Sequence, residues 1–339
     1  MRRFKFMRLT NALSAPARRA RKLGTVAAAA ALLVTLADAP QAVAQTAAAT
    51  PSGARARAAC DRACLIEIAD RYMAALVDKS WRDLPWAERV RFTENDVAMM
   101  IGDGVWGTVT KIDEAPFKLA DPATGNVLWV GIVEEHGQPA YYAMRLAIVD
   151  GQIADVETVV AREGTPAHFA PTAGYALDES FSETLPANER RPRERLIALA
   201  EGYYNTMQLN DGQLLGEFAP DCKRVSNGVD FTHGESAPAR GCRAQFEIGY
   251  YKPVDRVRAR RYPIVDEERG VVVAFAFLDH SARFVEYETR DGRTHSIPVE
   301  YPNSHRVVDL FKIRNGAVER VEGFAVFQPY LMPSLWKDE

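Results

Sequence analysis

The sequence contains no apolar run long enough to cross a membrane as a helix. Its main apolar run, Val26–Ala37, has 12 residues, whereas a bilayer core of ~30 Å requires about 20. Cysteine is scarce, with four residues, and no Cys-x2-Cys or His-x3-His pair supplies the usual spacing of a zinc site. No phosphate-binding loop of the Gly-x4-Gly-Lys type, Gly-x-Ser-x-Gly motif or His-Glu-x-x-His motif occurs either. We therefore expect no nucleotide, flavin or metal cofactor.

Acidic residues are absent from residues 1–24, which hold eight Lys or Arg. The apolar run follows, and Ala42-Val43-Ala44 then offers a small-residue cleavage site. This order predicts a signal peptide over residues 1–44 and a periplasmic or secreted protein. A retained anchor is the alternative. The pairs Arg2-Arg3 and Arg18-Arg19 leave open whether export uses the general or the twin-arginine route.

Basic residues are in the minority once residues 1–44 are removed. The remaining chain has 34 basic and 44 acidic residues, a net charge of about −10. Nucleic-acid binding needs clustered Lys and Arg, so we do not expect it. The one basic run, Arg256–Arg261, is interpreted as a solvated strand end, with an anion-binding patch as the alternative.

The four cysteines lie in two local pairs. Cys60 and Cys64 stand at the start of an expected helix, and Cys222 and Cys242 flank one hairpin-like region. Four cysteines allow three pairings. We expect Cys60–Cys64 and Cys222–Cys242, because each pair is close in sequence. The first is less favourable, since helical residues four apart lie near the upper limit of the Cα separation in a disulfide.

The chain contains an internal repeat. Residues 65–80 (LIEIADRYMAALVDKS) align without a gap with residues 196–211 (LIALAEGYYNTMQLND), and Tyr72 falls on Tyr203. Both segments have the apolar spacing of an amphipathic helix. Residues 144–162 align with residues 309–327, and each carries an Asp-Gly or Asn-Gly turn between alternating strands. A looser match joins residues 92–104 to residues 218–228.

Two domains follow from this repeat. Each half predicts a helix followed by a run of twisted antiparallel strands, with domains at residues 60–165 and 193–336. Residues 166–192 between them are rich in Pro, Ala, Ser and charge and lack periodicity. They predict a linker, either free or wrapped over the surface.

A Tyr-x3-Leu or Tyr-x3-Met helix step, a Phe-x-x-Asp/Asn step and a final Asn-Gly or Asp-Gly hairpin characterise both halves. In these features the chain resembles the nuclear transport factor two-like superfamily, also called SnoaL-like. The stretches CDRACL, RFTENDVAMMIGDGVWGT and PYLMPSLW resemble a secreted SnoaL-like family of fungi and bacteria. The resemblance implies an α+β fold of two tandem cones. In each, a curved antiparallel sheet packs with N-terminal helices and encloses an apolar pocket.

The resemblance also implies site residues in the second cone. Ketosteroid isomerase, a member of the superfamily, binds an oxyanion with a Tyr and a carboxylic acid at the positions of Tyr203 and Asp309. Its proton-shuttling Asp corresponds to Ser226 or Asn227, where this chain has no carboxylate. Scytalone dehydratase, another member, uses Tyr and His to eliminate water. The Asp-Arg-Asp arrangement of limonene epoxide hydrolase is not visible.

His305 lies on the same strand face as Asp309, because residues 305, 307, 309 and 311 alternate. Histidine has a pKa near neutrality and suits proton transfer. We therefore predict Tyr203, Asp309 and His305 as catalytic residues. Their structural alternatives are a packed tyrosine, a solvent-facing ion pair and a strand-edge histidine. Further residues are assigned to the pockets, each with a core or turn role as the alternative: Tyr72, Trp106, Asn227 and His280.

These features favour a cofactor-free lyase of the dehydratase type, or an isomerase. Its substrate would be an apolar small molecule, and aromatic molecules are among the candidates. A non-catalytic ligand-binding or accessory protein is the alternative. The partner expected in both cases is a hydrophobic small molecule, with no membrane association after signal cleavage. The sequence does not predict whether the protein forms an oligomer.

Overall fold

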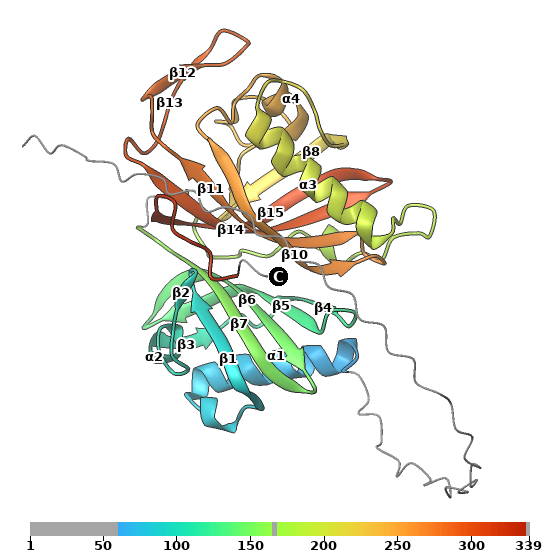
Figure 1. The fold of residues 1–339 in the computed structure, drawn as a ribbon, viewed down its shortest axis with the longest axis vertical. Helices are drawn as coiled ribbons and strands as arrows, with labels where there is room; N and C mark the ends of the chain where they lie inside the picture. Colours follow the sequence, from blue (N-terminus) through green and yellow to red (C-terminus); the bar gives the residue numbers. More distant parts are fainter. Residues whose placement is uncertain (1–59, 165–167, 337–339) are drawn as a thin grey trace, which may run out of the picture. The chain divides into compact units, whose positions relative to one another are not determined.

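The computed structural model describes residues 60–164 and 168–336, which belong to one compact unit (Figure 1). The predicted signal peptide, residues 1–44, lies outside the described residues. Within the described ranges, none of the helices has the length and apolar character needed to span a bilayer. The chain is α+β, with two large curved sheets and few helices.

The first half contains a long helix, a short helical turn, a second short helix and seven strands. They are α1 (Arg62–Asp78), η1 (Trp81–Asp83), β1 (Trp86–Glu94), β2 (Val97–Ala98), α2 (Val105–Thr108), β3 (Val109–Ile112), β4 (Phe117–Asp121), β5 (Asn126–Glu135), β6 (Gln138–Val149) and β7 (Gln152–Arg162). The strands form one sheet in the order β2-β1-β7-β6-β5-β3, with β4 also paired to β5.

The second half repeats this plan and adds a small two-stranded sheet, β12-β13. Its elements are η2 (Glu179–Ser182), α3 (Arg193–Leu209), β8 (Phe218–Ser226), β9 (Val229–Asp230), α4 (Cys242–Glu247), β10 (Arg256–Asp266), β11 (Val271–His280), β12 (Glu286–Glu288), β13 (Thr294–Ser296), β14 (Asn303–Arg314) and β15 (Ala317–Pro329). The large sheet has the order β10-β11-β14-β15-β8-β9.

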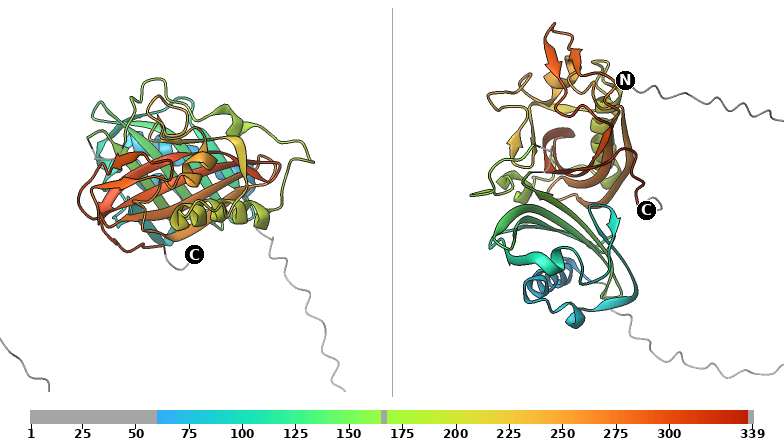
Figure 2. Two further views of the ribbon diagram at one scale, coloured as in Figure 1. Left: turned by 90° about the horizontal axis from the view of Figure 1, so that it is seen from above. Right: turned by 90° about the vertical axis from the view of Figure 1, so that its left-hand side faces the viewer.

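Both predicted helices form where the apolar spacing placed them. In α1 the Asp61 side chain accepts a hydrogen bond from the backbone N–H of Cys64, and Lys79 ends the helix in the left-handed conformation. Asn210 ends α3 in the same way. The buried faces of the two helices carry the equivalent residues Tyr72 and Tyr203. Figure 2 shows each sheet curving around its own long helix.

Tight hairpins close both halves, as the Asp-Gly and Asn-Gly turns predict. Asp150 and Gly151 both have positive φ, as do Asn315 and Gly316, which is the backbone of a type I′ turn. The resulting pairs β6–β7 and β14–β15 are antiparallel. The first strand of each half then pairs parallel with the last, β1 with β7 and β8 with β15.

The strand register corrects the looser sequence match between residues 92–104 and 218–228. Glu94 pairs with Thr158, and Ser226 pairs with Gly323 at the equivalent place in the other sheet. Asn95 therefore corresponds to Asn227. The amide of each asparagine bonds the N–H and C=O of one residue on the last strand, Val160 or Ala325. The sequence match was wrong because it placed Phe92 on Phe218. The strand register places Phe92 on Arg224, six residues later.

Three apolar clusters hold the protein together. One lies between α1 and the first sheet, and one between α3, α4 and the second sheet. The third joins residues of both sheets, including Leu128 and Phe324, with Phe181 from residues 168–192. Phe181 is fully buried, so this part of the predicted linker packs on the sheets.

Both predicted disulfides are present. Cys60 and Cys64 have a Cα separation of 5.3 Å, and Cys222 and Cys242 one of 5.2 Å. The second bond ties β8 to the start of α4. Asp61, between the first two cysteines, caps α1, so the helix begins inside that bridge.

Candidate functional site

The mouth of the second cone contains a cavity of about 150 Å³. An apolar cavity of this size accommodates a benzene-sized ligand. Its floor comes from β8, β11, β14 and β15, and its side from residues 250–255. Residues 281–299, which include the β12-β13 hairpin, cover it; Phe284, Tyr287 and Ile297 belong to this cover. The cavity is therefore built largely from apolar and aromatic side chains.

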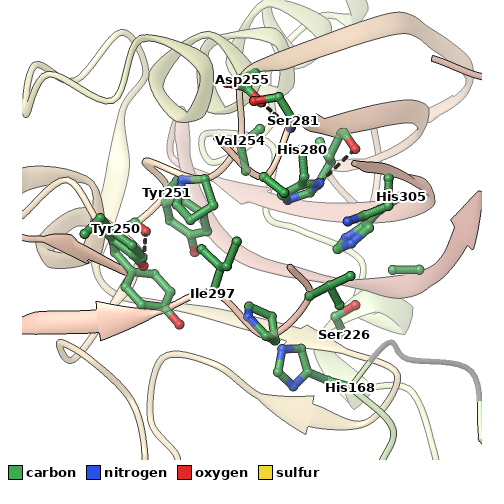
Figure 3. A pocket seen from close by; sticks show the side chains of 18 of the residues that line it. His168, Ser226, Tyr250, Tyr251, Val254, Asp255, His280, Ser281, Ile297 and His305 are labelled. Carbon is green, nitrogen blue, oxygen red and sulfur yellow. Dashed lines mark hydrogen bonds between the residues drawn. The ribbon is translucent and has the colours of Figure 1, made fainter. Parts of the chain in front are cut away.

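Two histidines lie against each other on the cavity wall (Figure 3). His280 ends β11 and His305 lies on the neighbouring strand β14; the ring centroids are 4.2 Å apart. Burial lowers the pKa of His280 to about 4. Burial also lowers the pKa of His305 well below its usual value, and the nearby His280 and Arg224 add to the effect. Both imidazoles are therefore neutral at pH 7.

The protonated nitrogen of His280 follows from its hydrogen bond. Nδ1 lies 3.2 Å from the backbone carbonyl oxygen of Leu278, and a carbonyl oxygen can only accept. Nδ1 therefore carries the hydrogen, and Nε2 of the neutral ring keeps a lone pair. The neighbouring His305 ring also contacts Phe327, with ring centroids 4.3 Å apart. His280 is thus held as a potential proton acceptor.

Arg224 supplies a positive charge to the same cavity. It lies on β8, where its Nη1 donates to the Tyr251 hydroxyl at 3.3 Å. The guanidinium carbon also lies over the rings of Phe231 and Tyr251, at 5.2 and 5.3 Å from their centroids. Tyr251 in turn donates to Gln245 Oε1 at 2.8 Å. These contacts fix the guanidinium without neutralising it.

Of the three predicted catalytic residues, only His305 lines the cavity. Alternate residues of β14 from His305 to Phe311 face the helices, as the alternation predicts. Asp309 on this face is buried in the core and does not line the cavity. Tyr204, one residue beyond the predicted tyrosine, donates to Asp309 Oδ2 at 2.7 Å. Burial raises the pKa of Asp309.

Tyr203 is buried at the narrow end of the cone. Its ring contacts Phe246 and Phe311, with centroid separations of 5.2 and 5.3 Å. Its hydroxyl makes no hydrogen bond to any residue that the structure describes. The cavity lining includes His305 but neither Tyr203 nor Asp309, and the catalytic role of the three residues stays a prediction.

The four residues assigned to pockets divide between cavity and core. His280 and Asn227 line the cavity. The Asn227 amide is occupied by the backbone of Ala325 and by the carbonyl of His168, so its role there is structural. Tyr72 and Trp106 lie in the core of the first half, where Trp106 Nε1 donates to the Tyr72 hydroxyl at 3.1 Å.

Sequence reasoning missed His168, Arg224 and the cover of the cavity. His168 lies in the segment interpreted as a linker, which has no periodicity to place it. Arg224 alternates with Ser226 on β8 and so faces the cone interior. That alternation could have been used, had the strand been given its correct register. The hairpin of residues 286–296 is short and shows no equivalent in the first half.

Gly102, Gly104 and Gly107 have the Gly-x-Gly-x-x-Gly spacing, which binds a pyrophosphate only between a strand and a full helix of a βαβ unit. Here it leads into the four-residue α2 and then into β3, an antiparallel neighbour of β5. The backbone N–H of Val105 donates to Glu94 Oε2 at 2.9 Å. The spacing therefore does not provide a nucleotide site.

Across residues 60–164 and 168–336, no three His, Cys, Asp or Glu side chains gather in a group that could hold a metal ion.

Comparison with solved structures gives partial matches. AusH from Aspergillus nidulans is 18% identical over 40% of this chain and 85% of its own, with a TM-score of 0.26. The BvnE pinacolase from Penicillium brevicompactum is 19% identical over 42% of this chain and 88% of its own, with a TM-score of 0.24. A protein with a cystatin-like fold from Caulobacter vibrioides is 17% identical over 39% and 88%, with a TM-score of 0.26. Scores of this size support no inference about activity.

No curated protein matches the chain. A family described as "Domain of unknown function (DUF8021)" matches residues 58–160 and 189–325, which together make up well over half of the sequence. The two matched segments each contain one helix and sheet of the tandem arrangement. The chain is a member of this DUF8021 family.

Proposed function

We propose that the second half is a cofactor-free lyase or isomerase that acts on a small, largely apolar molecule. The observation that carries this proposal is the pair His280 and His305, whose ring centroids lie 4.2 Å apart on the wall of a largely apolar cavity. A neutral imidazole keeps one nitrogen lone pair that can take a proton, and the hydrogen bond from His280 Nδ1 to Leu278 leaves that lone pair on Nε2.

The reaction that fits best is the elimination of water from a β-hydroxy carbonyl compound. One imidazole takes the proton next to the carbonyl, the C–O bond to the hydroxyl breaks, and a C=C bond forms. The same proton returns to the departing hydroxyl, which leaves as water, so the histidine pair ends neutral. An isomerase would return the proton to another carbon instead. The positive charge of Arg224 at the same cavity supports this chemistry, because it favours negative charge on the substrate.

The test compares turnover in matched variants. Purified protein is screened against aromatic β-hydroxy ketones, with conjugated product followed by absorbance and mass spectrometry. His280→Gln and His305→Gln should each lower kcat by about 10²- to 10⁴-fold. His136→Gln, at an exposed histidine of the first half, is the control and should change kcat little. Turnover that survives in both histidine variants would remove the proposal.

A second candidate is a ligand-binding protein without catalysis. It is favoured by one observation: the Asp309 carboxyl is bonded to Tyr204 in the core and does not line the cavity. An acid placed there does not reach a ligand in the mouth of the cone. Saturable binding of apolar aromatic compounds by wild-type protein, with no product from any of them, would support this candidate.

We also propose that the protein works in the periplasm or outside the cell and that it is SnoaL-like. Two disulfides support export, because such bonds persist in oxidising compartments. Cell fractionation with N-terminal sequencing of the recovered protein tests this. Export predicts a start close to residue 45 and protein outside the cytoplasm. Full-length protein confined to the cytoplasm would contradict it.

A further inference from the structure

Arg224 differs from the other arginines at the cavity and in the core. Arg283, which also lines the cavity, forms an ion pair with Asp255. Arg306 and Arg261 both pair with Glu157. Across the residues that the structure describes, Arg224 forms no ion pair with a carboxylate; its side chain bonds the Tyr251 hydroxyl and lies over two aromatic rings. Among those residues, the only hydrogen-bond acceptor of this half-buried guanidinium is therefore a neutral oxygen.

The other groups that face the cavity do not supply a compensating charge. His280 and His305 are neutral at pH 7 because burial lowers the pKa of each. The Asp255 carboxylate is taken by Arg283 and by the backbone N–H of Ser281. The lining therefore carries one uncompensated positive charge, on Arg224.

Asp309 is the carboxyl group whose charge acts on Arg224 from the core side. It is buried, bonded to Tyr204 and absent from the cavity lining, and it forms no ion pair with Arg224 within the structure as described. Burial raises the pKa of Asp309, which further weakens it as a counter-ion. Because Arg224 lines the cavity, guanidinium N–H donors that are not bonded to Tyr251 can reach an acceptor placed there.

We propose that the occupant of this cavity carries a carboxylate, which binds to Arg224, on a small apolar or aromatic body. A planar guanidinium pairs with a carboxylate through two parallel hydrogen bonds, and such pairs strengthen where water is excluded. The apolar body would lie against Ile297 and Leu278, close to His280 and His305. This names the substrate class of the proposed enzyme, and in that respect it rests on the proposed function.

The test measures binding without requiring turnover. Three aromatic acids, benzoate, phenylacetate and cinnamate, are each compared with their neutral amide by calorimetry and ligand-observed NMR on the full exported chain. The acids should bind wild-type protein about 10- to 100-fold more tightly than the amides, because the amide cannot form the charged hydrogen bonds. The preference should weaken as salt is raised, since the interaction is ionic.

Two variants and a matched control assign the preference to one residue. Arg224→Gln should bind acid and amide alike, and Arg224→Lys should keep part of the preference. Arg243→Gln, at an exposed pair with Glu247 away from the cavity lining, is the control and should leave the preference intact. The thermal unfolding midpoint of each variant confirms that it is folded. The acid–amide comparison in wild-type protein stands even if a variant does not fold.

Equal binding of acids and amides, a preference that persists in Arg224→Gln, or no binding of any of the six probes would each overturn the inference. The outcome is separable from that of the proposed function. Acid-selective binding without turnover of any carboxylate substrate would contradict the proposed enzyme function and support the carboxylate inference. Histidine-dependent turnover of neutral ketones, with no preference for acids in binding, would contradict the carboxylate inference and support the proposed enzyme function.

Discussion

Glu157 and Glu322 occupy the same position in the two halves, and their carboxyl groups have pKa values shifted in opposite directions. Glu157 pairs across the sheet with Arg145, and Glu322 with Leu310. Burial alone would raise both. For Glu157 the charges of Arg261, Arg145 and Arg306 outweigh burial and hold the pKa below its usual value. For Glu322 burial dominates and raises the pKa to about 7.

Glu157→Gln should destabilise the protein. The change leaves Arg145, Arg261 and Arg306 buried without their shared carboxylate. Breaking a buried pair of this kind costs about 3–5 kcal/mol in the free energy of unfolding. Urea denaturation at pH 7 measures it. The control is Glu134→Gln, at an exposed pair with Lys111, where the change should not exceed about 1 kcal/mol. Equal effects in the two variants would contradict the prediction.

Glu322→Gln should stabilise the protein at pH 8 and have little effect at pH 4. The folded-state pKa of about 7 lies above the ordinary 4.5. Between these pH values the folded protein keeps a proton that the unfolded chain has released, so stability falls as pH rises through this window. The full loss corresponds to about 3 kcal/mol. Thermal unfolding midpoints of wild type and variant from pH 4 to 8 should diverge with rising pH; parallel curves would refute the assignment.

His280 should titrate near pH 4. Its folded-state pKa lies below the ordinary 6.5 because of burial. The unfolded chain therefore takes up a proton between pH 6.5 and 4 that the folded protein refuses, and stability falls as pH is lowered through this range. Imidazole nitrogen shifts in NMR report both the titration and the expected Nδ1–H tautomer. A titration midpoint of His280 near pH 6.5, or a mixture of its two neutral tautomers, would contradict this prediction.

Trp336→Ala should cost about 3–5 kcal/mol in the free energy of unfolding. The Trp336 side chain is fully buried, donates from Nε1 to Thr93 Oγ1 at 3.1 Å, and lies under the guanidinium of Arg91, 3.9 Å from the ring centroid. Its neighbour Leu335 is exposed, so Leu335→Ala is the control and should change stability by only about 0.5 kcal/mol. Guanidinium denaturation gives both values. Similar losses would mean that the segment is not anchored by the tryptophan.

Much of the fold could be predicted because it depends on local sequence patterns, and the internal repeat contains each of these patterns twice. The apolar spacing around Tyr72 and Tyr203 marks both long helices, and the turns at Asp150-Gly151 and Asn315-Gly316 mark both final hairpins. Close sequence spacing was enough to pair the cysteines. The parallel pairing of β1 with β7 and of β8 with β15 joins segments far apart in sequence, and no local pattern announces it.

The site was harder to predict because alternation tells only which face a side chain takes, and not how deep it lies. His305 and Asp309 do share a face of β14, as expected, but only His305 reaches the cavity. Depth is set by side chains from other elements, such as Phe246 on α4, which packs against Tyr203.

The sequence by itself determined the two-fold repeat, the α+β class, the two helices, the closing hairpins and both disulfides, since each follows from residues close together in the chain. Tertiary structure alone decided where the cavity lies, which histidines meet and which arginine of the cavity, among the described residues, lies beside a tyrosine hydroxyl and not a carboxylate. It also decided that Glu157 is compensated while Glu322 is not. Those outcomes depend on distant side chains brought together, because burial and charge pairing arise only once the strands have taken their register.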